Sequence, residues 1–352
     1  MDIKNLLQKL NQAKASDLLL VAENPVCLRV NNGLIKQSPE LLSATDIENL
    51  ITPIISKEDL AEFKKTKELD TAFEDEHSRY RINLHYQRGS IAATIRRIPY
   101  EIPSIESLGL PKLVKELTTL ERGLVLVTGP TGHGKSSTQA AMINAINQSR
   151  ACHIITIEDP IEFVHKPQLA ILEQREVGLD TASFDEALKR VLRQIPDVIL
   201  IGEMRDLESI RMAITAAETG HLVISTLHTQ DAVQSIDRMI DVFPPHQQAQ
   251  IRSMLSLTLQ GIVSQQLIPK KENQGLALAM EILVTTPAIR NIIRKGSSQE
   301  IYSMIELGAQ QGMIPMDNSI RDLARKGIIS KDEALLHSIN RERMEKMLSG
   351  AA

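Results

Sequence analysis

The sequence predicts a two-domain α/β protein, and three observations lead to this fold class. The chain has 352 residues, which is more than one ordinary hydrophobic core organises. From Pro111 onward, apolar strand-like runs alternate with helical segments, the pattern of a mainly parallel sheet covered by helices. The third observation is a glycine-rich loop at 129–136, which follows a strand-like run and precedes a helical one.

The first part of the chain predicts an α/β domain at 1–98 without a phosphate loop of its own. Apolar residues recur at helical spacing over 2–13 and at alternate positions over 80–86 and 91–98. These patterns predict a helix and a pair of strands. The other expected elements are strands at 17–21 and 26–30, a hairpin turn at Asn31-Asn32-Gly33, and helices at 44–51 and 57–64.

A proline-rich stretch at 99–111, closed by the turn at 109–111, predicts a linker. The second domain then extends over 112–352, with helices dominating from about 270. Strands are expected at 123–128, 153–157, 197–201 and 222–227, with helices at 137–146, 184–194, 206–219, 288–294, 299–306, 316–325 and 331–338.

The glycine-rich loop matches the phosphate-binding pattern G-x-x-x-x-G-K-[ST]. Its glycines let several backbone N–H groups converge on phosphates at the positive end of a helix. Lys135 then reaches the β- and γ-phosphates, and the Ser136 hydroxyl ligates Mg²⁺. We therefore expect the chain to bind a nucleoside triphosphate with Mg²⁺. The residues expected around the nucleotide are Gly129, Pro130, Thr131, Gly132, His133, Gly134, Lys135, Ser136 and Ser137.

Carboxylates follow two apolar runs that are expected to be parallel strands. Glu203 ends one of them, where it could hold Mg²⁺ through water or simply begin the next helix. Glu158, Asp159 and Glu162 end the other. Since ligands bind at the carboxyl ends of such strands, one of these three is expected to orient or deprotonate water. The alternative is a solvated acidic turn.

Two histidines, His221 and His228, flank the predicted strand at 222–227. They are either γ-phosphate sensors or ordinary surface residues that form hydrogen bonds. A zinc site is not expected, because no cysteine or further histidine stands at ligand spacing.

Five arginines concentrate on the predicted strand pair of the first domain. Two of them, Arg79 and Arg81, share one face of a strand because side chains repeat every two residues. The cluster is either a solvated face or a source of arginine fingers for a nucleotide held elsewhere. Its members are Arg79, Arg81, Arg88, Arg96 and Arg97.

Composition narrows the classes of partner. A net charge of −4, 3% aromatic residues and no tryptophan argue against a nucleic-acid surface, so none is expected. Cys27 and Cys152 suggest neither a disulfide framework nor a zinc clip. No signal peptide and no run of about 20 apolar residues is found. We therefore expect a cytoplasmic location.

Together these motifs resemble the secretion-ATPase superfamily, the hexameric motors of type II secretion and type IV pilus systems, and most closely its PilT-like retraction branch. The resemblance covers nearly the whole chain. The segments that carry it are the Walker A loop at 129–136, the Asp box at 158–163, the Walker B end at 202–206, the His box at 219–221 and 226–229, and a retraction signature at 288–294.

The resemblance implies a PAS-like α/β module followed by a RecA-like P-loop ATPase core with a helical C-terminal part, and it implies that the bound nucleotide is ATP. It implies catalytic roles for Glu162, Glu203, His221 and His228, and it makes Arg81 and Arg97 fingers that act across a subunit boundary. The implied partners are a homo-hexamer, a platform protein at the inner-membrane face of the pilus base, and a paralogous retraction ATPase.

The sequence departs from the family pattern at His133, where serine is usual, at Lys295 after the retraction signature, and at Leu19 in the N-terminal motif. Four alternatives stay open. They are an accessory PilU-like retraction motor, an assembly or type II secretion motor, a DNA motor, and an adaptor that binds nucleotide without hydrolysing it. The four-cysteine module of assembly motors is missing.

Overall fold

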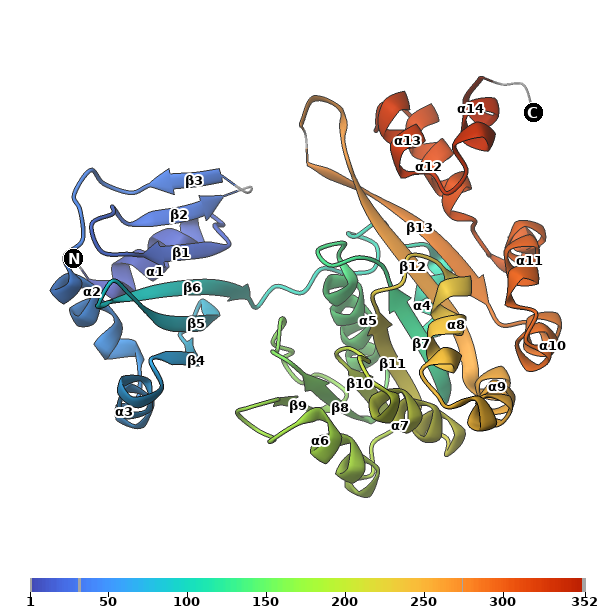
Figure 1. Cartoon of the computed structure of the whole chain (residues 1–352), viewed down its shortest axis with the longest axis horizontal. Coiled ribbons are helices and arrows are strands. Elements are labelled where there is room, and N and C mark those ends of the chain that lie inside the picture. The colour runs from blue at the N-terminus through green and yellow to red at the C-terminus, as the bar shows by residue number, and fades with distance from the viewer. Residues whose placement is uncertain (1, 31–32, 274, 350–352) are drawn as a thin grey trace. The chain divides into compact units, whose positions relative to one another are not determined.

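The computed structural model describes residues 2–30, 33–273 and 275–349. The chain divides into two compact units, Met1–Glu101 and Ile102–Ala352, and each is described by itself (Figure 1). Within the described ranges, no helix is long and apolar enough to cross a membrane.

The first unit contains a six-stranded antiparallel sheet in the order β3-β2-β1-β6-β5-β4. Apolar side chains of its strands and helices form one core. The elements are α1 (Ile3–Gln12), β1 (Asp17–Leu20), β2 (Cys27–Val30), β3 (Gly33–Lys36), α2 (Ala44–Ile51), α3 (Lys57–Thr66), β4 (Glu68–Glu74), β5 (Ser78–Gln87) and β6 (Ser90–Pro99).

Side chains alternate cleanly along β5. Tyr80, Ile82 and Leu84 are buried, while Arg79 and Arg81 lie on the opposite, less buried face as predicted. Strands β3 and β4 were not predicted because they are edge strands whose side chains are mostly exposed or half-buried, which leaves little hydrophobic alternation to detect. The predicted turn residues Asn31 and Asn32 lie outside the described residues.

The second unit contains a seven-stranded sheet in the order β13-β12-β7-β11-β10-β8-β9. All neighbouring strands run parallel except the antiparallel pair β12 and β13, so the predicted, largely parallel sheet is confirmed. The strands are β7 (Gly123–Thr128), β8 (His153–Glu158), β9 (Ile171–Glu176), β10 (Val198–Ile201), β11 (Leu222–Leu227), β12 (Leu259–Pro269) and β13 (Leu276–Val284).

Helices cover both faces of this sheet (Figure 1). Along β7, Leu124 and Leu126 pack in the core formed with α6 to α11, while Val125 and Val127 pack in the core formed with α4 and α5. The helices are α4 (Lys112–Leu117), α5 (Lys135–Ser149), α6 (Phe184–Val191), α7 (Leu207–Glu218), α8 (Ala232–Asp241), α9 (Pro245–Thr258), α10 (Pro287–Lys295), α11 (Ile301–Leu307), α12 (Met316–Arg325), α13 (Lys331–His337) and α14 (Arg341–Ser349).

The region from about 270, predicted to be mostly helical, contains helices α10 to α14 and also the strand β13, which was not predicted. The segment LALAMEILV has residues that also suit helices, and it becomes a strand by pairing with β12 from Gly261 opposite Val284 to Pro269 opposite Leu276. Helices α12 to α14 then form a small core of their own with residues of β12 and β13.

The stretch predicted as a linker is not uniform in the structure. Its later residues belong to the second unit, where Ile105 and Leu110 are buried in the core shared with α4 and α5.

Candidate active site

The glycine loop connects the buried strand β7 to helix α5, and two of its glycines are required by geometry. Gly129 has φ = 141°, and a Cβ there would lie 2.4 Å from the Gln265 carbonyl oxygen on β12. Gly134 caps α5 with φ = 82°. Only glycine fits both positions without strain, so the loop can follow β12 closely and turn sharply into the helix.

Lys135, the first residue of α5, is buried beneath this loop. Its Nζ donates hydrogen bonds to the carbonyl oxygens of Gly129 at 2.7 Å and Pro130 at 2.9 Å. Burial lowers the pKa of Lys135, and the negative charge of Glu162 opposes this change. The ammonium therefore interacts with neutral carbonyls here, and a phosphate would be a stronger partner for it.

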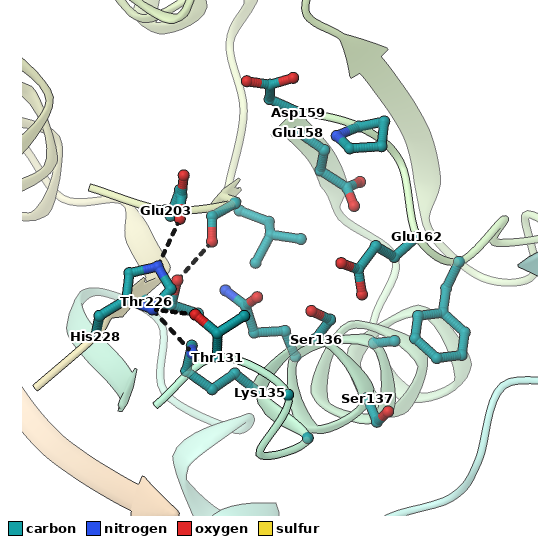
Figure 2. Close-up of a pocket in the computed structure, with 18 of the residues that line it drawn as sticks. Thr131, Lys135, Ser136, Ser137, Glu158, Asp159, Glu162, Glu203, Thr226 and His228 are labelled. Carbon is teal, nitrogen blue, oxygen red and sulfur yellow. Dashed lines mark hydrogen bonds and ion pairs between the residues drawn. The ribbon is translucent and has the colours of Figure 1, made fainter. Parts of the chain in front are cut away.

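A pocket of about 450 Å³ opens above the loop and reaches the ends of β8, β10 and β11 (Figure 2). It brings together most of the residues predicted from the sequence. Those that line it are Thr131, Gly132, Gly134, Lys135, Ser136, Ser137, Glu158, Asp159, Glu162, Glu203 and His228.

His228, directly after β11, connects the loop to the carboxylate at the end of β10. Its Nδ1 lies 3.4 Å from Lys135 Nζ and 3.3 Å from Thr131 Oγ1, and its Nε2 lies 2.9 Å from Glu203 Oε2. An ammonium only donates, so Nδ1 accepts and Nε2 carries the proton that is donated to Glu203. Burial, together with the charges of Lys135 and Arg205, lowers the pKa of His228, which keeps this imidazole neutral.

Glu203 follows Gly202, which allows the end of β10 to lie close to β8. A Cβ at Gly202 would lie 3.3 Å from the backbone of Glu158. The Glu203 carboxylate also forms an ion pair with Arg205. Glu203 is therefore held between a neutral imidazole and a guanidinium at the mouth of the pocket.

Two of the acids that were candidates at the end of β8, Glu158 and Glu162, have different surroundings in the structure. The Glu158 carboxylate accepts hydrogen bonds from Thr156 Oγ1 at 2.7 Å and from Gln174 Nε2 at 3.2 Å. Burial raises its pKa, against the effect of these donors and of the Glu162 backbone N–H. Glu162 is exposed and directs its carboxylate toward Ser136 across the pocket (Figure 2). Glu162 is thus the acid that remains available to a water molecule.

Two predicted histidines do not join the pocket. His133 Nδ1 accepts a hydrogen bond from the Leu267 backbone N–H at 3.0 Å, so the side chain is directed to β12. Burial, with the charges of Lys135 and His337, lowers its pKa. His133, which was expected among the residues around the nucleotide, therefore does not line the pocket.

His221 directly precedes β11 and His228 directly follows it. The two histidines therefore lie at opposite ends of this strand, roughly 20 Å apart. The His221 Nδ1 lies 3.0 Å from the Ala216 carbonyl oxygen. Of the two histidines predicted to be either γ-phosphate sensors or surface residues, His228 lines the pocket and His221 does not.

Arg81 and Arg97 belong to the first unit. Arg81 forms an exposed ion pair with Asp70 at 3.6 Å, and Arg97 Nε donates to the Ala15 carbonyl at 3.1 Å.

Two predicted loop residues, Gly129 and Pro130, do not line the pocket. Their carbonyl oxygens accept the hydrogen bonds of Lys135 beneath the loop.

Several pocket residues were missed by sequence reasoning. Gln139 and Ala140 lie three and four positions after Ser136 in α5, and this helical spacing was the available signal. Arg205 and Thr226 lie inside motifs already recognised, so only their individual roles were missed. Gln174 does not line the pocket but bonds Glu158, which does. It had no signal in the sequence, because it lies on the edge strand β9, outside the motifs.

The donor set is compatible with a metal–nucleotide complex. Ser136 presents a hydroxyl in the first turn of α5, and Glu203 offers a carboxylate at the same pocket. Among the described residues, no group of three or more His, Cys, Asp or Glu side chains could hold a metal ion. Mg²⁺ bound with a nucleotide commonly takes one or two protein oxygens and completes its ligands with water and phosphate.

A buried lysine under a glycine loop, with carboxylates at the ends of adjacent parallel strands, defines a P-loop nucleoside triphosphatase. The model of the family described as type II/IV secretion system protein matches residues 3–336, and the chain belongs to this family.

Two relatives from Pseudomonas aeruginosa align over nearly the whole chain. The type IV pilus retraction ATPase PilT is 45% identical over 335 residues, 95% of this chain and 97% of that protein. The type IV pilus ATPase PilU is 38% identical over 96% of this chain and 89% of that protein. A crystal structure of the pilus retraction motor PilT with bound ADP has a TM-score of 0.92 and 42% identity, covering 98% of this chain and 99% of that one. The predicted resemblance to retraction ATPases is confirmed, as are the mixed α/β fold and the assignment as an ATPase.

Proposed function

We propose that this chain hydrolyses Mg-ATP to drive retraction of a type IV pilus and so twitching motility. The observation that carries the proposal is the continuous contact from Lys135 through His228 to Glu203, which joins the phosphate loop to the ends of two further strands in one pocket. The relatives named for pilus retraction support the biological assignment.

Each of these pocket residues has its own role in the proposed reaction. Lys135 exchanges the carbonyls of Gly129 and Pro130 for phosphate oxygens. Ser136 and, through water, Glu203 would hold Mg²⁺. Bound Mg²⁺ supplies neutralisation of the charge on the β- and γ-phosphates. Glu162 orients the attacking water and accepts its proton at the carboxylate. The Nδ1 of the neutral His228 imidazole contacts the Lys135 ammonium, and this contact changes when the ammonium moves to phosphate.

The chain is further proposed to act as a homo-hexamer. Its first domain, 1–98, is taken as a PAS-like module, and 112–352, after the linker 99–111, as a RecA-like core. Arg81 and Arg97 are proposed to act on the nucleotide of another subunit. If so, mixing inactive Lys135→Ala chains with inactive Arg81→Ala/Arg97→Ala chains restores part of the ATPase activity. Mixed assemblies verified by mass that stay inactive would count against this part of the proposal.

The motor is proposed to work in the cytoplasm, on a platform protein at the inner-membrane face of the pilus base. Deletion of the gene tests the whole proposal. It predicts cells with more surface pili and no twitching, and complementation with the unaltered chain restores both properties. Fewer pili on deletion would indicate an assembly motor, and continued twitching would indicate an accessory role beside a second retraction ATPase.

A further inference from the structure

The side-chain amide of Gln174, on the edge strand β9, lies at the centre of the segment that carries Glu162. We propose that Gln174 is a positioning residue for ATP hydrolysis, which fixes the backbone directly after Glu162, at Phe163 and His165, so that the Glu162 carboxylate faces the pocket. The inference rests on the proposed function of Glu162 and assigns a role to a residue outside the recognised motifs.

Strand pairing brings Gln174 to this place. Strands β8 and β9 run parallel with Thr156 opposite Gln174 and Glu158 opposite Glu176. Since side chains repeat every two residues, all four project from the same face of the sheet. The chain leaves β8 after Glu158 and passes over this face before it returns as β9.

Both the nitrogen and the oxygen of the Gln174 side-chain amide form hydrogen bonds with this segment. Its Nε2 donates to the carbonyl oxygen of Phe163 at 2.8 Å, and its Oε1 accepts from the backbone N–H of His165 at 2.7 Å. Phe163 is the residue directly after Glu162. Nε2 also donates to Glu158 Oε1 at 3.2 Å. A reversed amide would place its oxygen against two other acceptors, so these partners fix its orientation.

The segment is also held before Glu162. The Ile161 backbone N–H donates to Glu176 Oε2 at 3.3 Å, and the Glu162 backbone N–H bonds Glu158. Over the parts of the chain that the structure describes, the Glu162 carboxylate itself forms no hydrogen bond or ion pair. The backbone around Glu162 is therefore fixed while its carboxylate is left available, as a base that must meet a water molecule requires.

Replacement of the amide by an apolar side chain of similar size tests this role. In Gln174→Met, kcat for ATP hydrolysis is expected to fall at least about tenfold, because a displaced catalytic group loses its near-attack geometry. The affinity for Mg-ATP, measured by equilibrium binding of a fluorescent ATP analogue, is expected to stay within about twofold, because the loop and Lys135 hold the phosphates. Glu173→Gln, on the opposite face of the same strand, is the matched control and is expected to retain kcat.

A second variant gives a readout that a merely structural role would not produce. Gln174→Glu keeps an acceptor for His165 N–H but regains a donor only when the new carboxyl is protonated. Its kcat relative to that of Gln174→Met is therefore expected to rise as the pH falls from about 8 to 6. The titratable groups that face this position are Glu158, Glu162, Glu176 and His165. The pKa of His165 is lowered to about 4 by burial, so His165 stays neutral in this range.

Three results would overturn the inference. They are a Gln174→Met kcat within about twofold of the unaltered chain, equal losses of kcat and nucleotide affinity, or a Gln174→Glu ratio that does not change with pH. If Gln174→Met does not fold, kcat of Gln174→Glu is compared with kcat of the unaltered chain instead. A ratio of the two that does not change with pH would again overturn the inference. An unaltered chain without ATPase activity would refute the proposed function instead, which keeps the two failures distinct.

Discussion

The imidazole of His228 donates a hydrogen bond to the carboxylate of Glu203, with 2.9 Å between Nε2 and Oε2. The other ring nitrogen faces Lys135, so one neutral side chain connects the phosphate-binding lysine to the acid at the end of β10. We expect phosphate binding at Lys135 to be coupled to the position of Glu203 through this imidazole.

Removal of this connection is predicted to slow turnover more than it weakens binding. In His228→Ala, ATPase turnover should fall about 10- to 100-fold, the range of a lost electrostatic group, while the loop retains the nucleotide. Steady-state kinetics together with equilibrium binding measure both quantities. His246→Ala, an exposed histidine on α9, is the control. Equal weakening of binding and turnover would mean that His228 only holds the nucleotide.

The two acids of the β8 segment are predicted to differ. Glu162→Gln should lose at least about 10²-fold in turnover and still bind Mg-ATP, because only the proton acceptor is removed. Glu158→Gln should lose less, since its oxygen can still accept from Thr156 and Gln174. Single-turnover hydrolysis measures the chemical step in each variant. The reverse order of losses would make Glu158 the base.

Much of this site could be predicted because its parts are local in sequence. The strand, glycine loop and helix from Gly123 to Ser149 can be recognised from a short continuous stretch of sequence. The acids at strand ends can be recognised because each follows an apolar run. Strand β13 and Gln174 could not be predicted in this way. The first depends on pairing with β12, and the second on the register of β9 against β8. His221 was misplaced because the spacing of two histidines does not tell which strand end faces the nucleotide.

His133 is predicted to be electrostatically silent toward the nucleotide. It is directed to the Leu267 backbone, and burial lowers its pKa, which favours the neutral ring. Curves of ATP affinity against pH, measured from about 6.5 to 8, should therefore run parallel for the unaltered chain and His133→Ser. A pH dependence that appears only in the unaltered chain would show that a protonated imidazole contacts the phosphates.

Glu281 on β13 is predicted to make stability fall with rising pH. Burial raises its pKa to about 7, with Asp231 and Asp317 acting in the same direction and hydrogen bonds from the Ala232 and Met316 backbones opposing. Between about pH 4.5 and 7 the folded chain therefore holds a proton that the unfolded chain has lost, and the stability decreases across this range.

Glu281→Gln removes this dependence and retains an oxygen for the Ala232 N–H, 2.9 Å away. At pH 8 the variant should melt at a higher temperature than the unaltered chain, and its free energy of unfolding should be larger by at most about 3 kcal/mol. Both differences should shrink toward pH 5. Thermal unfolding followed at several pH values measures this, with the exposed Glu300→Gln as the control. A difference that stays constant with pH would contradict a titrating Glu281.

The most direct test of the account is the rate of Mg-ATP hydrolysis by the purified chain and its Lys135→Ala variant. Lys112→Ala serves as the control, because that lysine side chain is 89% exposed and lies on α4. Loss of the buried ammonium removes the cation on the β- and γ-phosphates. The account predicts clear turnover by the unaltered chain and the control, and no detectable turnover by Lys135→Ala with the fold intact. Turnover by Lys135→Ala close to the unaltered rate would contradict it.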